Sequence, residues 1–226
     1  MRRVISIAQR KGGVGKTTLA VCVSAELKAR GHDVTLVDSD PQSSASRWAD
    51  PGNLDFRVLE LPLGDESVVT WAKEVQRIKA DYVVIDTAPN DRSLGAASAI
   101  SDLVLVPCTP SGLDLEATIR TLEIVDAVRV PPHSVPRLML VPNRVDRRTL
   151  EGQQLVEELV AFGEHVSPPI GNRAVFVRAF STGFPISGWA GELAYGEIRA
   201  LTDLVERFLS SVPADAQRRF TTMRQT

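Results

Sequence analysis

The chain has 226 residues, of which 43% are hydrophobic and 24% are charged. That length favours one sizeable domain, and 26 basic against 28 acidic side chains exclude a globally basic nucleic-acid coat protein and an acidic disordered chain. Two cysteines cannot form a disulfide framework, and the first residues lack the apolar stretch of a signal peptide. We therefore expect a cytoplasmic protein.

Runs of strand length that are rich in Val, Ile and Leu alternate with longer segments of helical period. The runs predict buried strands at residues 4–8, 34–37, 57–61, 82–85, 103–106 and 138–141. The longer segments predict helices at 16–30, 66–79, 115–128, 149–161 and 192–209. This alternation favours a single-domain α/β fold over residues 1–212, with a mostly parallel twisted sheet and helices on both faces. Residues 167–188, rich in proline and glycine, are expected to be irregular, and the polar residues 213–226 to form a flexible tail.

The strongest motif, KGGVGKTT, lies between the first predicted strand and the first predicted helix. It comprises Lys11, Gly12, Gly13, Val14, Gly15, Lys16, Thr17 and Thr18. Glycines let backbone N–H groups close around phosphate oxygens, and the N-terminus of the helix adds positive potential. Lys16 is placed to reach the β- and γ-phosphates, and the Thr17 hydroxyl to ligate Mg²⁺. The motif therefore predicts a nucleotide site, although the general pattern has glycine where this chain has Arg10.

Carboxylates end two of the predicted strands. Asp38 and Asp40 follow the second strand, and the alternation of side chains puts both on one face. Asp86 follows the fourth strand, which is the setting of a Walker B carboxylate that holds Mg²⁺ directly or through water. Ligands of open α/β folds bind at this edge of the sheet, although Asp40 can also cap a helix that starts near Pro41.

These motifs together resemble those of the ParA/MinD family of ATPases. KGGVGKTT, with lysine at its start, resembles the deviant Walker A box of that family, which does not require glycine at position 10. The segment 37–42, VDSDPQ, looks like its second box, and 83–87, VVIDT, like its Walker B strand. The resemblance implies ATP and Mg²⁺ as cofactors and a homodimer with ATP sandwiched between the subunits. Lys11 would then contact the ATP of the partner subunit, Asp40 would orient the attacking water, and Asp38 would belong to the Mg²⁺ surroundings.

Asn143 ends the sixth predicted strand, in a segment, VPNR, that is similar to the base-recognition strand end of the family. Its amide can pair with a donor and an acceptor of adenine, or it can simply form a turn after Pro142. The sequence from Asn143 to Asp146 also comes near the N-K-x-D pattern that reads guanine. The preference for ATP over GTP therefore depends partly on the resemblance.

The resemblance implies nonspecific DNA as one partner of the ATP-bound dimer and a ParB-like protein, which stimulates slow hydrolysis, as another. The family places DNA-contacting basic residues in the last third of the chain, where the candidates are Arg173, Arg178, Arg199, Arg207, Arg218 and Arg219. Alternatively, these are solvated arginines that balance nearby glutamates. This interpretation predicts a nucleoid-associated protein that partitions or positions DNA or protein cargo.

Two alternatives share the fold. A MinD-like protein would end in an amphipathic membrane-binding helix, but the last residues offer only Phe220 and Met223 as large apolar groups, which argues against membrane binding. An ATP-coupled ligase would share the phosphate loop, and the lysine at position 11 together with the Asp-Pro-Gln box weighs against it.

Overall fold

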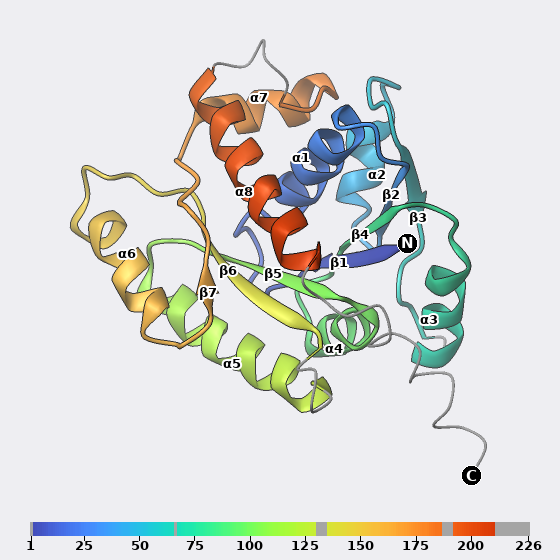
Figure 1. The fold of residues 1–226 in the computed structure, drawn as a ribbon, viewed down its shortest axis with the longest axis horizontal. Helices are drawn as coiled ribbons and strands as arrows, with labels where there is room; N and C mark the ends of the chain where they lie inside the picture. Colours follow the sequence, from blue (N-terminus) through green and yellow to red (C-terminus); the bar gives the residue numbers. More distant parts are fainter. Residues whose placement is uncertain (1, 66, 130–134, 187–191, 211–226) are drawn as a thin grey trace.

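A computed structural model describes residues 2–65, 67–129, 135–186 and 192–210. Its seven strands form one sheet in the order β3-β2-β4-β1-β5-β6-β7, and every pair of neighbours is parallel (Figure 1). The strands are β1 (Arg3–Ile7), β2 (Val34–Asp38), β3 (Arg57–Glu60), β4 (Tyr82–Asp86), β5 (Leu103–Cys108), β6 (Arg137–Pro142) and β7 (His165–Val166). The predicted α/β fold with helices on both faces is therefore confirmed, and the sheet is wholly parallel.

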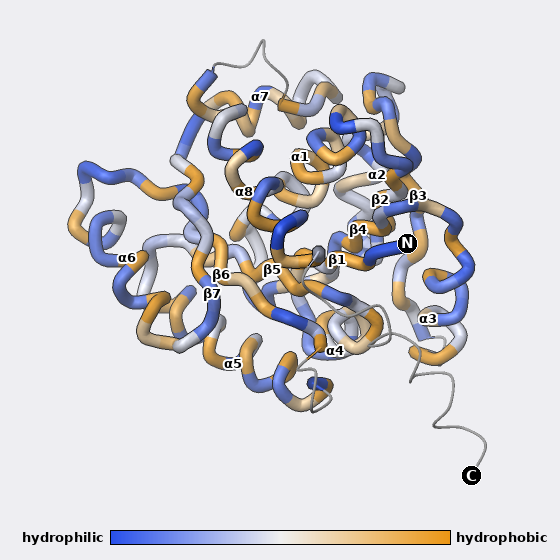
Figure 2. The backbone as a smooth tube through the Cα atoms, viewed as in Figure 1, coloured by the Kyte–Doolittle hydropathy of each residue, from blue (hydrophilic) through white to orange (hydrophobic). Residues whose placement is uncertain are grey.

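Helices cover the sheet in two layers. One layer consists of α1 (Lys16–Ala29), α2 (Ser44–Ala49), α7 (Ala174–Thr182) and α8 (Glu192–Ser210) (Figure 1). The other consists of α3 (Val68–Arg77), α4 (Asp91–Ile100), α5 (Gly112–Val128) and α6 (Leu150–Val160). Along α6, hydrophobic and hydrophilic residues alternate as expected for a helix with one buried face (Figure 2).

Successive residues of the central strands face opposite layers. Leu103 and Leu105 pack in the cluster beneath α1 and α8, whereas Val104 and Val106 pack in the cluster beneath α4, α5 and α6. All four side chains are fully buried. This explains why the sequences of the central strands are continuous runs of apolar residues, since a strand covered on both sides has no polar face.

The sequence predicted six of the seven strands and five of the eight helices in the described residues. It missed α2, α4 and the two-residue strand β7. The expectation that residues 167–188 are irregular was wrong for the middle of this segment, where the third missed helix, α7, forms. Gly183 caps the end of α7 in a left-handed conformation. The predicted tail, residues 213–226, lies outside the described residues. Within the described ranges no helix combines the length and the apolar character needed to cross a membrane.

Candidate nucleotide-binding site

The phosphate loop joins β1 to α1 at the carboxyl edge of the sheet. Gly13 and Gly15 adopt left-handed conformations, with φ of 78° and 95°. Gly15 is the N-cap of α1 and provides no side-chain cap, so the first N–H groups of the helix keep their capacity for a ligand. A helix N-terminus with this geometry attracts anions such as phosphate.

Asn143 braces the phosphate loop from β6. Its side-chain nitrogen Nδ2 donates a hydrogen bond to the carbonyl of Val14 at 2.7 Å, and only 5% of the residue is exposed. A Cβ atom on Gly15 would lie closer than 3.0 Å to the same Nδ2. Glycine is therefore required at position 15 for its φ and for this close approach. The role of Asn143 in reading adenine remains a prediction, and its amide already holds the loop in this structure.

Lys16 is the first residue of α1 and is only 7% exposed. Its Nζ donates to the backbone carbonyl of Lys11 at 3.0 Å, across the loop. Burial lowers the pKa of Lys16, while the nearby carboxylates of Asp86 and Asp40 act in the opposite direction. The ammonium group thus lies within the loop that would enclose phosphates, next to two negative charges.

Thr17 and Asp86 meet beside the loop. The Thr17 hydroxyl donates to Asp86 Oδ2 at 2.6 Å, and Asp86 Oδ1 is buried with no hydrogen-bond partner among the described residues. Burial raises the pKa of Asp86 to about 7, with the Thr17 hydrogen bond acting against it. A hydroxyl and an unpartnered carboxylate oxygen are the hard oxygen ligands that Mg²⁺ prefers, so the residues fit that ion.

Asp38 is the last residue of β2, Asp40 lies on the loop that joins β2 to α2, and their surroundings differ. Asp38 is fully buried, and its Oδ2 accepts hydrogen bonds from the backbone N and the hydroxyl of Ser46, at 2.8 and 3.0 Å. Burial raises the pKa of Asp38, and the Ser46 hydrogen bonds oppose that shift. Asp40 accepts a hydrogen bond from the backbone N of Gln42 at 3.0 Å and lines a cavity at the phosphate loop. Asp38 thus anchors α2, whereas Asp40 faces that cavity.

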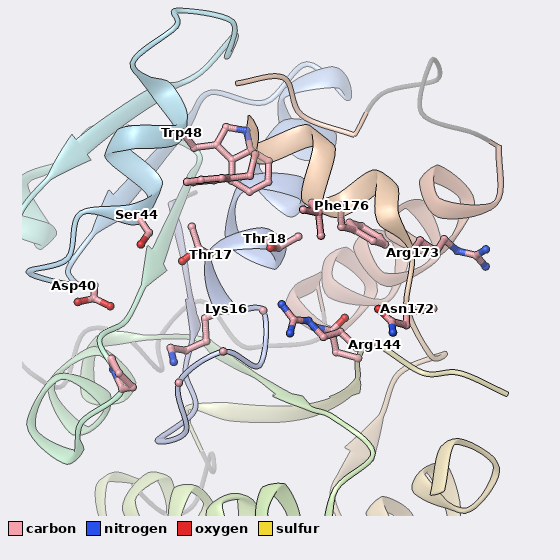
Figure 3. Close-up of a pocket in the computed structure, with 18 residues that line it drawn as sticks. Lys16, Thr17, Thr18, Asp40, Ser44, Trp48, Arg144, Asn172, Arg173 and Phe176 are labelled. Carbon is pink, nitrogen blue, oxygen red and sulfur yellow. The ribbon is translucent and has the colours of Figure 1, made fainter. Parts of the chain in front are cut away.

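A cavity of about 510 Å³ opens above the phosphate loop. It brings together Gly12, Gly13, Gly15, Lys16, Thr17, Thr18, Asp40 and Asn143, all of which the sequence singled out. Asp40 and Ser44 lie on one side of the loop, and Arg144, Asn172 and Phe176 on the other (Figure 3). Val14 is buried, and Lys11 and Asp86 are not part of the lining.

Comparison with known proteins decides the family. Residues 5–186 match the CobQ/CobB/MinD/ParA nucleotide binding domain. The chain belongs to this family. The predicted resemblance to ParA/MinD proteins is therefore confirmed, and the chain carries a ParA/MinD-type nucleotide-binding domain.

Curated relatives align over most of this ParA/MinD-type chain. It is 30% identical to "Maintenance of carboxysome distribution protein A" of Halothiobacillus neapolitanus, over 89% of this chain and 95% of the relative. It is 29% identical to "Protein ParA" of Rhizobium radiobacter, over 80% of this chain and 83% of the relative. The first of these relatives is named for the distribution of carboxysomes, and the second is named ParA.

Solved structures confirm the fold. The Cyanothece McdA–ATP complex has a TM-score of 0.72 and 21% identity, over 92% of this chain and 96% of that one. MinD from Pyrococcus horikoshii with Mg-ADP has a TM-score of 0.70 and 18% identity, over 95% of this chain and 100% of that one. The prediction of ATP and Mg²⁺ as cofactors agrees with the ligands of these two structures.

The predicted DNA-contacting arginines of this ParA/MinD-type chain have different surroundings. Arg173 lines the cavity and forms an ion pair with Glu197 at 2.6 Å, while Arg178, Arg199 and Arg207 are exposed. Arg218 and Arg219 lie outside the described residues. Helix α8 carries four acidic side chains beside its two arginines, so its surface is not basic by itself.

Sequence reasoning missed the aromatic part of the site. Trp48 on α2 and Phe176 and Phe180 on α7 line the cavity, and the Trp48 and Phe180 rings meet edge to face with centroids 5.4 Å apart. Neither helix was predicted, so no signal pointed to these side chains. Cys22 and Cys108 are both buried and free.

Proposed function

We propose that this chain is an ATPase that dimerises around ATP and Mg²⁺ and uses that cycle to partition or position cargo. The observation that carries the proposal is the presence of two lysines with different placements on one phosphate loop. Lys16 is buried in the loop, whereas the Lys11 side chain is 35% exposed and lies outside the cavity lining. A lysine with that placement is suited to reach a nucleotide held by a second copy of the chain.

Residues that line the cavity, together with Asp86 and Lys11 beside it, would supply the chemical step. Lys16 and the loop N–H groups bind the phosphates, and Thr17 with Asp86 holds Mg²⁺, which neutralises charge on the β- and γ-phosphates. Asp40 lines the cavity on the side opposite Arg144 and Asn172, and it orients the attacking water (Figure 3). Lys11 from the partner subunit adds positive charge where the phosphoryl oxygens become more negative.

The dimer is tested by light scattering in the presence of ATP. The wild-type chain should double in mass when ATP and Mg²⁺ are added, and Asp40→Ala should accumulate the dimer because hydrolysis is blocked. Lys16→Ala should abolish ATP binding, and Lys11→Ala should retain binding but remain monomeric. A Lys11→Ala chain that dimerises as readily as the wild type would refute the cross-subunit role.

The output that we propose is reversible binding of the ATP-bound dimer to nucleoid DNA, with release when a ParB-like partner stimulates slow hydrolysis. Support comes from the relative named for carboxysome distribution and the relative named ParA. The exposed arginines Arg178, Arg199 and Arg207 are the described candidates for phosphate contacts. Because α8 is acidic overall, we assign the largest contribution to Arg178 on α7.

DNA retention gives a separate test of that output. Binding to random-sequence duplex should require ATP and fall steeply as salt rises, because phosphate contacts release counterions. Arg178→Glu should weaken retention, whereas the matched reversal Arg57→Glu, at an exposed position of the edge strand β3, should leave it unchanged. Equal retention of the nucleotide-free chain would contradict an ATP-controlled switch.

A further inference from the structure

Lys11, the partly exposed lysine of the phosphate loop, is held by a carboxylate of its own subunit. Lys11 Nζ forms an ion pair and hydrogen bond with Asp114 Oδ1, in the first turn of α5. Asp114 is only 1% exposed, and its second oxygen accepts a hydrogen bond from the Thr109 hydroxyl. Among the described residues the carboxylate therefore has two side-chain donors, and of these only Lys11 carries a charge.

The same face of α5 holds the residues that precede Lys11. Asp114, Thr118 and Thr121 lie at helical spacing, and all three are buried although polar. Gln9 Nε2 donates to Thr118 Oγ1 at 3.1 Å, and Thr121 Oγ1 donates to Gln9 Oε1 at 2.6 Å. A buried polar stripe on α5 thus fixes the start of the phosphate loop and sets the position from which Lys11 leaves it.

We propose that Asp114 is a positioning residue that restrains Lys11 within its own subunit and thereby sets the nucleotide concentration at which the chain dimerises. The inference rests on the proposed function, because Lys11 must leave Asp114 to reach the phosphates of the partner's ATP. One ammonium group cannot serve both anions fully, so the intrasubunit pair and the intersubunit contact compete.

Because Asp114 is buried, it costs free energy for Lys11 to leave it. When Lys11 leaves, the Asp114 carboxylate stays at a position that solvent barely reaches. Among the described residues, only the Thr109 hydroxyl then still donates a hydrogen bond to it. Removing the charge of Asp114 should therefore favour the dimer. Removing the Thr109 hydroxyl should have the opposite effect, because Asp114 then depends on Lys11 alone.

The test measures the concentration of AMPPNP, a non-hydrolysable ATP analogue, that gives half-maximal dimer by light scattering. Asp114→Asn should lower this midpoint about fivefold, the size expected for a partly exposed ion pair. Thr109→Val, which keeps the shape of the side chain, should raise it. Asp126→Asn is the matched control, since it removes the same charge from the same helix at a side chain that is 59% exposed and paired with Arg129.

A purely structural role for Asp114 predicts the reverse sign, because damage to the loop would raise the midpoint in Asp114→Asn. Such a rise, or an unchanged midpoint in both variants, overturns the proposal. If the wild type does not dimerise, the proposed function itself fails, and acylation of Lys11 by an N-hydroxysuccinimide ester then tests the pair in the monomer. Asp114→Asn should increase the rate of acylation of Lys11 relative to the rate at Lys28. An unchanged ratio of the two rates would show that Asp114 does not restrain Lys11.

Discussion

Replacing Gly15 by alanine tests the packing of the phosphate loop against β6. Gly15 has a φ of 95°, which an L side chain adopts only under strain, and a Cβ atom there would collide with the Asn143 amide. That amide donates to the Val14 carbonyl at 2.7 Å, so the collision also breaks a buried hydrogen bond.

The two costs can be added from general magnitudes. A left-handed conformation costs an alanine roughly 1–2 kcal/mol. Loss of the buried amide–carbonyl bond costs about 1–3 kcal/mol. We therefore expect Gly15→Ala to lower the free energy of unfolding by about 3 kcal/mol, and the melting temperature by about 6–12 °C for a domain of this size.

Urea unfolding followed by circular dichroism measures the effect, and two further variants identify its cause. Gly12→Ala is the matched control on the same loop, because a Cβ there meets no described atom within 4 Å, and it should change stability by less than about 0.5 kcal/mol. In an Asn143→Ala background the collision is absent and the hydrogen bond is already lost, so Gly15→Ala adds only the conformational cost. The double variant should therefore be about 1–2 kcal/mol more stable than the sum of the single effects predicts.

Additivity of the two substitutions would refute the reasoning, because it would mean that Gly15 and Asn143 do not contact each other. So would a Gly15→Ala chain as stable as Gly12→Ala, since the left-handed conformation alone should separate them.

Three further predictions concern buried groups. Burial raises the folded-state pKa of Asp86 to about 7, so the native chain binds that proton more tightly than the unfolded chain, and without nucleotide its stability should fall as pH rises from about 4 to about 7. In urea titrations, the fall in unfolding free energy between pH 5 and pH 7.5 should be about 2 kcal/mol smaller in Asp86→Asn than in the wild type. The same dependence of stability on pH in both proteins would contradict the raised pKa of Asp86. Trp71 is fully buried and its Nε1 donates to Leu61 O at 2.9 Å, so Trp71→Ala should cost about 3–5 kcal/mol of unfolding free energy, and a loss below 1 kcal/mol would be inconsistent with this packing. Burial raises the pKa of Cys22 and Cys108 to about 12, so neither thiol should react with Ellman's reagent at pH 8 unless urea is added, and rapid labelling of the folded chain would show that they are accessible.

The sequence by itself determined the alternation of strands and helices, the phosphate loop and the carboxylates at the strand ends. These features are local, since apolar periodicity, glycine spacing and a charge after a buried run each involve neighbours along the chain. Tertiary structure decided where helices with weak local signals form. Helix α2 has six residues and α4 consists largely of small side chains, while α7, rich in aromatic and β-branched residues, packs against Trp48.

Tertiary structure also decided which groups hold the phosphate loop. Asn143 contacts Val14 across 129 positions of sequence, and Asp114 contacts Lys11 across 103. Nothing in the spacing of these residues indicates their pairing. It arises only because the strand order places β5 next to β1 and β6 next to β5, which brings the end of β6 and the start of α5 to the phosphate loop. The motif predicts a nucleotide site at the loop, but the packing of distant helices and strands determines the position of Lys11, on which the proposed dimer depends.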